Sequence, residues 1–350
     1  MEILRIENLS FQYPGASEAA LKEINLSISE GEFILLCGTS GCGKTTLLRL
    51  IKNELAPAGQ KSGRILYAGK PTEEADEKTS AAAIGYVMQN PDSQIVTDRV
   101  YSELAFGLEN LGVPSDAIRR RVGEMANYFG IADWFRKKTN ELSGGQKQLL
   151  SLACVMVMQP RLLILDEPTG QLDPIAAADF IATLQKINRE LGLTVLLAEH
   201  RLEEIFPVAD RVLCMENGSI RLFDTPRAIG AQLGGAEIPP ALRQALPSAM
   251  RIYRALGTGG ECPLSVREGR EYLAGRFAPL PCPAQPQNAL KKAPDGADEK
   301  KPPAIALKNV WFRYEKDLPD VLRGVTEQIE TGELYCLLGG NGSGKTTVLR

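Results

Sequence analysis

The sequence predicts an α/β fold with a parallel sheet, followed by a partial second copy of the same domain. Residues 33–37 form an apolar run that enters a glycine-rich turn, and residues 45–53 then read as a helix. Two further runs, 162–165 and 194–197, are apolar throughout, as is typical of parallel strands covered on both faces. Strands that alternate with helices in this order favour an α/β architecture.

The segments between these strands carry clear boundary signals. Asp173 and Pro174 supply an N-cap and a first-turn proline for a helix over 175–189. Residues 96–127 are more helical, with a break at 112–114, and we expect them to form an inserted subdomain. The pair Asn217 and Gly218 indicates a hairpin near the end of the domain.

An internal repeat holds one register over some forty residues. The segment that ends at Tyr13 is echoed by the segment that ends at Tyr314, and the glycine loop that begins at Gly38 recurs from Gly339, always 301 positions apart. The second copy stops at Arg350, just after its loop, so we expect a tandem protein whose second domain is truncated and whose natural chain is longer.

The predicted domain boundaries follow from this repeat and from the proline content. Eleven of the 22 prolines fall between Pro239 and Pro303, a density that favours extended chain over long helices. We therefore predict a complete domain over 1–236, a proline-rich linker over 237–303 with a short helix around 241–256, and a partial domain over 304–350.

Composition narrows the class of protein. Hydrophobic residues make up 44% and charged residues 24%, while 40 Lys and Arg are set against 43 Asp and Glu. This balance gives no basic excess for nucleic acid, so no nucleic-acid partner is predicted. The longest apolar run, 149–158, is about half of a membrane span, and the seven cysteines are scattered. We predict a soluble protein of the cytoplasm.

The loop that begins at Gly38 fits the phosphate-binding pattern G-x-x-x-x-G-K-[ST]. Its glycines allow backbone N–H groups to turn inward, its lysine reaches the β- and γ-phosphates, and its hydroxyl reaches Mg²⁺. A chance glycine turn is the alternative, but two such loops, each after an apolar strand, favour nucleotide binding. The predicted contacts are Gly38, Thr39, Ser40, Gly41, Cys42, Gly43, Lys44, Thr45 and Thr46, and in the second copy Gly339, Gly340, Asn341, Gly342, Ser343, Gly344, Lys345, Thr346 and Thr347.

Two carboxylates, Asp166 and Glu167, end the apolar run over 162–165. They could simply be the solvated end of a core strand. Beside a phosphate-binding loop, however, the first carboxylate can hold the Mg²⁺ shell and the second can orient or deprotonate water.

Ser143 and Gln146 form a capping-box pattern around Gly144 and Gly145. The cap alone could explain the pattern, yet a glycine-rich helix N-terminus can also bind an anion, such as the γ-phosphate of a nucleotide on another subunit. Cys42 lies in the first loop next to a lysine and a helix N-terminus, both of which favour a thiolate; a buried and inert cysteine is the alternative.

Together these motifs resemble the ATPase subunits of ABC transporters over the whole first domain. The resemblance implies a RecA-like parallel-sheet core, an antiparallel β subdomain, an inserted helical subdomain, and ATP and Mg²⁺ as cofactors. It makes Tyr13, and Tyr314 in the second copy, the aromatic that stacks on adenine. It makes Gln89 a ligand of Mg²⁺ beside Thr45 and Asp166. Residues 142–146 resemble the signature motif, residues 172–173 the D-loop, and His200 the switch histidine, so that Glu167, His200 and Gln89 would be catalytic.

The resemblance is narrower in three segments, which are similar to the energy-coupling factor (ECF) ATPases: 86–94, 103–110 and 199–201. ECF ATPases drive uptake of vitamins or of cobalt and nickel ions. The D-loop departs slightly from that pattern, with Gly170 and Gln171 before it. In this family two ATPase domains pair head to tail, and integral-membrane scaffold and substrate-binding subunits are the partners. The protein would then lie on the cytoplasmic face of the cell membrane, with residues 90–103 as the docking segment. A soluble tandem ABC ATPase that acts on ribosomes is the alternative, and a nucleotide-binding regulatory piece is a third.

Overall fold

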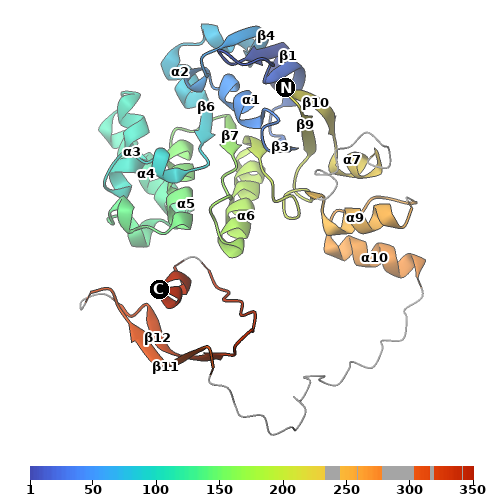
Figure 1. Ribbon diagram of the computed structural model, residues 1–350. Coiled ribbons are helices and arrows are strands. Elements are labelled where there is room, and N and C mark those ends of the chain that lie inside the picture. Colours follow the sequence, from blue (N-terminus) through green and yellow to red (C-terminus); the bar gives the residue numbers. More distant parts are fainter. Residues whose placement is uncertain (233–244, 258, 278–302, 316–318, 341) are drawn as a thin grey trace. The chain divides into compact units, whose positions relative to one another are not determined.

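The computed structural model describes residues 1–232, 245–257, 259–277, 303–315, 319–340 and 342–350 (Figure 1). By its internal contacts the chain divides into two compact units, Met1–Leu273 and Ala274–Arg350.

Unit one holds two sheets. The six-stranded sheet has the order β10-β9-β3-β8-β7-β6, and its neighbours run parallel except for β10 against β9. The four-stranded sheet is antiparallel, with the order β2-β1-β4-β5. The strands are β1 (Glu2–Gln12), β2 (Leu21–Ser29), β3 (Phe33–Gly38), β4 (Gln60–Tyr67), β5 (Lys70–Pro71), β6 (Ile84–Val87), β7 (Leu162–Asp166), β8 (Thr194–Ala198), β9 (Arg211–Glu216) and β10 (Ser219–Asp224). The predicted parallel core and antiparallel subdomain are confirmed.

The core lies on both faces of the six-stranded sheet. Because successive side chains of a strand point to opposite faces, β3 sends Phe33 and Leu35 into one apolar cluster and Ile34 and Leu36 into the other. The first cluster is shared with α3, α4, α5 and α6, and the second with α1 and the antiparallel sheet. Figure 1 shows α1 between the two sheets and α3, α4 and α5 grouped at one side. Apolar side chains on both faces explain why these strands read as continuous apolar runs.

Helix boundaries follow the predicted signals closely. The helices are α1 (Lys44–Ile51), α2 (Glu77–Ala83), α3 (Val100–Asn110), α4 (Ser115–Tyr128), α5 (Gly144–Met156), α6 (Pro174–Leu191), α7 (Pro226–Gln232), α9 (Ser248–Ala255) and α10 (Val266–Arg276). The Asp173 carboxylate accepts from the N–H groups of Ile175 and Ala176, as an N-cap should. The predicted break over 112–114 separates α3 from α4, and Asn217 and Gly218, both with positive φ, join β9 to β10. Helix α1 ends two residues earlier than predicted, because Lys52 is extended.

The end of the first unit differs from the sequence-based boundary at 236. Of the predicted helix over 241–256, the structure describes residues 245–256, which include α9. Helix α9 and most of α10 belong to unit one. The reason is apolar packing: Met250 and Tyr253 are buried in the first core cluster, and Gly230 of α7 lies so close to Cys262 that a Cβ there would sit 2.3 Å from its Sγ. The proline-rich residues 278–302 lie outside the described part of the chain.

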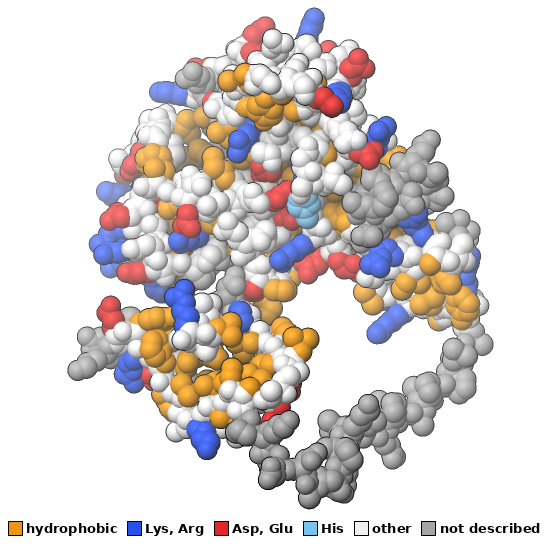
Figure 2. Space-filling view, viewed as in Figure 1, with side chains coloured by type: hydrophobic (Ala, Val, Ile, Leu, Met, Phe, Trp, Pro, Cys, Tyr) orange, Lys and Arg blue, Asp and Glu red, His pale blue; other side chains and the backbone are white. Residues whose placement is uncertain are grey.

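Unit two contains an antiparallel pair, β11 (Ile305–Phe312) and β12 (Leu322–Ile329), and the short helix α11 (Lys345–Leu349). Residues 334–338, the counterpart of β3, form no strand, and Leu334 and Leu338 are 98% and 84% exposed. Figure 2 shows hydrophobic side chains gathered on the visible face of this unit. Among the described residues, none of the helices has the length and apolar character needed to cross a bilayer.

Candidate functional site

Three neighbouring strands of the six-stranded sheet end side by side. In the register of the sheet, Ala198 at the end of β8 pairs with Leu36 of β3 and with Asp166 at the end of β7. The glycine loop after β3, the carboxylates of β7 and the histidine after β8 are therefore brought to one edge. The carboxyl edge of a parallel sheet is where α/β proteins bind ligands.

Backbone geometry explains the glycines of the loop. A Cβ at Gly38 would lie 2.4 Å from the carbonyl oxygen of Met215, and one at Gly43, whose φ is +104°, would lie 2.7 Å from that of Ala20. Lys44 is buried, and its Nζ donates to the carbonyls of Gly38 at 3.1 Å and Thr39 at 3.4 Å. The loop thus curls around the lysine. No side chain caps the N-terminus of α1, so its first N–H groups are left to a ligand.

Glu167 lies at the centre of the predicted catalytic residues. Its Oε1 is 2.7 Å from Nε2 of His200 and 3.6 Å from Nζ of Lys44, and its Oε2 accepts from Nε2 of Gln89 at 3.1 Å. Its backbone is left-handed, with a φ of +50°, which is uncommon for a residue with a side chain. The His200 side chain is 43% exposed, and Figure 2 shows this only histidine of the chain at the surface beside acidic side chains.

Asp166 forms a second centre behind Glu167. Its Oδ1 accepts from the hydroxyl of Thr45 at 3.0 Å and its Oδ2 from the hydroxyl of Tyr86 at 3.2 Å. Burial raises the pKa of the Asp166 carboxyl and, together with the Asp166 charge, that of the Tyr86 phenol. A buried carboxylate and a hydroxyl in contact are hard oxygen ligands, so the pair fits Mg²⁺. Gln89, the third predicted Mg²⁺ ligand, donates to the side chain of Glu167, the residue that follows Asp166. Tyr86 was not predicted as a site residue.

The aromatic predicted to stack on adenine makes the same hydroxyl contact in both copies. The Tyr13 hydroxyl is 2.9 Å from the Thr46 hydroxyl, and that of Tyr314 is 3.0 Å from Thr347. In the second loop, Nζ of Lys345 donates to the carbonyls of residues 339 and 340, as Lys44 does to their counterparts. The lysine therefore makes the same backbone contacts in the described residues of both loops. Asn341, which the sequence placed in this loop, lies outside the described residues.

The segment that resembles the signature motif lies at the N-terminus of α5. The predicted capping box is present, since the Ser143 hydroxyl accepts from the Gln146 N–H and the Gln146 side chain accepts from the Ser143 N–H. Ser143 and Gly144 are exposed, and a Cβ at Gly144 would meet nothing within 4 Å. The N-terminus of α5 is thus open to a ligand held elsewhere.

The expected thiolate at Cys42 is wrong. The side chain is 3% exposed and packs into the core beneath the loop, and burial raises the pKa of its thiol more than the nearby Lys44 lowers it. Desolvation outweighs the favourable charge, because the sequence could not show which way the side chain points. Only the backbone of Cys42 remains available to a phosphate.

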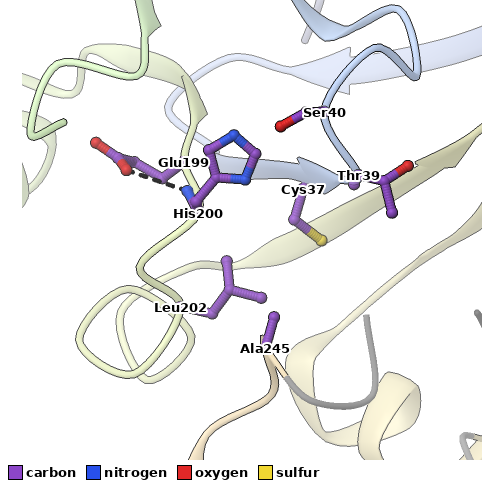
Figure 3. Close-up of a pocket in the computed structure, with 8 residues that line it drawn as sticks. Cys37, Thr39, Ser40, Glu199, His200, Leu202 and Ala245 are labelled. Atoms are coloured by element: carbon purple, nitrogen blue, oxygen red, sulfur yellow. Dashed lines mark hydrogen bonds between the residues drawn. The ribbon is translucent and has the colours of Figure 1, made fainter. Parts of the chain in front are cut away.

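A cavity of about 310 Å³ opens beside the glycine loop (Figure 3). Its walls include Thr39 and Ser40 of the loop, His200 after β8, and Ala245 from the segment that leads into α9. Glu199 also lines it, and a dashed line in Figure 3 marks the bond from the His200 N–H to the Glu199 carboxylate. Sequence reasoning gave Glu199 no role, although an acidic residue at the end of a buried strand was a signal.

Known proteins show the same domain. A model of the family described as "ABC transporter" matches residues 21–170. A solved structure of cbiO1 from Clostridium perfringens, described as part of the ABC transporter complex cbiONQ, is 35% identical and superposes with a TM-score of 0.61 over 66% of this chain and 92% of that one. The chain belongs to the ABC transporter ATPase family. The predicted ABC ATPase family and fold are confirmed.

Two curated relatives extend the similarity. A putative ABC transporter ATP-binding protein of Bacillus thuringiensis subsp. konkukian is 44% identical over 98% of this chain, and one of Methanosarcina mazei is 36% identical over 99%. The ABC ATPase chain spans about 60% of the length of these relatives. A solved dimer of the ATP-binding cassette MJ0796, in a post-hydrolysis state with ADP and Pi, is 25% identical with a TM-score of 0.57.

Proposed function

We propose that the first domain binds Mg-ATP and hydrolyses it to drive an ECF-type importer for vitamins or transition-metal ions. The single observation that carries the hydrolysis is the convergence of Lys44, Gln89 and His200 on the Glu167 carboxylate. These groups come from four separate segments of the chain, and nucleotide chemistry explains why they meet.

The residues divide the work by their positions. The backbone of the glycine loop and Lys44 hold the phosphates, and Tyr13 offers its ring to the adenine. Glu167 orients the attacking water and accepts its proton, while Gln89 and His200 position that water and the terminal phosphate. Thr45 and Asp166, with Gln89 nearby, would hold Mg²⁺, which would neutralise phosphate charge when bound.

The open N-terminus of α5 supports a head-to-tail pair, in which Ser143 to Gln146 of one domain face the γ-phosphate on another. Each nucleotide would then be held by the loop of one domain and the signature of its partner. The internal repeat supports a second ATPase domain in tandem with the first.

Likeness to cbiO1, a member of a transporter complex, supports integral-membrane scaffold and substrate-binding partners and a place on the cytoplasmic face of the membrane. The docking segment around 90–103 is well braced: Glu103 is buried and accepts from the N–H groups of Val96 and Thr97. Val96 and Tyr101 are themselves exposed, as a docking surface requires.

Replacing the central carboxylate tests the chemistry. Glu167→Gln should keep ATP binding and lose hydrolysis by on the order of 10²-fold or more, because the amide cannot accept the proton of water. His200→Ala should also lower turnover strongly. ATPase assays and ATP-binding titrations on the complex with its membrane partner would decide; near-normal hydrolysis in both variants contradicts the proposal.

Fractionation separates the transport function from a ribosomal one. The transport proposal expects the chain to co-purify from membranes with an integral partner, and to lose that partner on Tyr101→Asp. Co-sedimentation with ribosomes instead would favour the soluble alternative.

A further inference from the structure

The switch histidine is flanked by a buried carboxylate with an unusual set of partners. Glu199 is only 2% exposed. Its Oε1 accepts two hydrogen bonds from Thr169, at 2.9 Å from the backbone N and 2.6 Å from the hydroxyl. Its Oε2 accepts from the backbone N–H of His200 at 3.1 Å. One carboxylate thus joins the segment after β7 to the segment after β8.

Thr169 belongs to the turn that carries Glu167. The Glu167 backbone is left-handed and its N–H donates to Ala198, while its carbonyl accepts from Gly170. Thr169 is 1% exposed, and its own carbonyl accepts from Leu172. The turn is therefore tight, so any shift of Thr169 is passed to Glu167 two residues earlier.

A second bond ties the two segments on the other side of the histidine. The Arg201 guanidinium donates to the carbonyl of Leu172 at 3.3 Å. The two sequence neighbours of His200 therefore both form hydrogen bonds with residues of the segment 169–172. The Nε2 of His200 lies 2.7 Å from the Glu167 carboxylate in the same arrangement.

We propose that Glu199 and Thr169 form a clamp that sets the distance between Glu167 and His200. The inference rests on the proposed function of that pair in ATP hydrolysis. Both clamp residues are positioning residues, because Glu199 contacts the backbone of His200 and Thr169 belongs to the turn that carries Glu167. Bonds to a buried carboxylate are short and charge-assisted, so the clamp is stiff, and geometry held within a fraction of an ångström is what positioned water requires.

Thr169→Val removes the hydroxyl donor, keeps the shape of the side chain and leaves the backbone N–H in place. We expect kcat for ATP to fall about 10-fold while ATP affinity stays within about twofold, because the glycine loop is untouched. Glu199→Gln should behave similarly, since an amide cannot accept from Thr169 and from His200 at once. Thr169→Ser keeps the hydroxyl and should restore kcat. As a control, Thr183→Val removes a hydroxyl bond to the backbone carbonyl of Asp179 on α6 and should leave kcat unchanged.

A spectroscopic readout is independent of turnover. The chain has one histidine. Once any affinity tag is removed, the imidazole ¹⁵N signals of the full chain therefore report only the His200 ring. The clamp predicts that Thr169→Val shifts these signals and Thr169→Ser restores them. If Thr169→Val keeps the wild-type kcat and its ¹⁵N signals do not shift, the clamp is overturned. It is also overturned if ATP affinity and melting temperature fall in proportion to kcat. If Glu167→Gln hydrolyses ATP normally, the proposed function fails, while the ¹⁵N signals still test the clamp.

Discussion

At the scale of single residues, burial decides the behaviour of the ionisable groups around the loop. Asp166 is 6% exposed and keeps its carboxylate beside two hydroxyl donors, whereas Cys42 has its thiol sealed beneath the loop. In both cases desolvation raises the pKa, but the consequences differ. The aspartate holds a position that a cation can use, and the cysteine becomes a small apolar side chain.

Asp166→Asn should raise the melting temperature of the chain at pH 7 in EDTA and reduce hydrolysis by on the order of 10²-fold or more. The raised pKa means that the folded chain binds a proton at Asp166 more tightly than the unfolded chain does. Burying the charged carboxylate therefore lowers the stability of the folded chain. This loss is absent when the pH is below the pKa of Asp166 in the unfolded chain, and it is complete when the pH is above its pKa in the folded chain. The gain in melting temperature should shrink as the pH falls through the folded pKa. Asp179→Asn, at an exposed site on α6, is the control; an equal gain there contradicts the argument.

Cys42 should react slowly with a maleimide at pH 7, with or without Mg-ATP, and faster as the pH rises. Cys336, which is exposed, gives the reference rate within the same sample. Peptide mass spectrometry measures both rates. Rapid labelling of Cys42 that ATP slows would show that the thiol faces the nucleotide after all.

At the scale of elements, the boundary signals in the sequence translate directly into hydrogen bonds. Asp173 caps α6 through two backbone N–H groups, and Asp173→Ala should lower the free energy of unfolding by about 1 kcal/mol. That loss corresponds to roughly 2–4 °C in melting temperature for a domain of this size. Asp179→Ala, within the same helix and exposed, should change it little. Equal losses in both variants, measured by denaturant titration, would remove the capping argument.

The sequence predicted those features of the fold and of the site whose signals lie in a short stretch of neighbouring residues. The capping box at Ser143, the hairpin at Asn217 and the glycine loop at Gly38 each depend on neighbours along the chain, and all were predicted. The bond from Tyr86 to Asp166 and the bonds from Thr169 to Glu199 join residues 80 and 30 positions apart. Such pairs depend on strand order and register, which residue types alone do not specify.

The direction of side chains was the other missing information. Cys42 follows a glycine whose positive φ turns the chain, and its side chain enters the core. The first unit likewise extends to Leu273 because Met250 and Tyr253 find apolar partners, which the surrounding prolines concealed in the sequence.

At the scale of the whole molecule, the motifs are distributed unequally between the two copies. The first domain has a glycine loop, a signature and the carboxylate pair, whereas residues 304–350 have only the aromatic and the glycine loop. In the proposed head-to-tail pair, Ser143 of one first domain faces the nucleotide held at Lys44 of another. Two first domains from separate chains would form such a composite site.

The hydrolysis rate per chain should then rise steeply with protein concentration and level off once the chains are paired. Ser143→Arg should lower the plateau, because a bulky side chain at the open N-terminus of α5 blocks the approach of a γ-phosphate held by the partner. Ser115→Arg, at the start of α4 and outside the signature, should leave it unchanged. ATPase assays across a dilution series, with the mass in solution followed by light scattering, make the measurement. Because pairing is required, activity and dimer fraction should follow the same concentration curve; full hydrolysis by a chain that light scattering shows to be monomeric would refute the paired site.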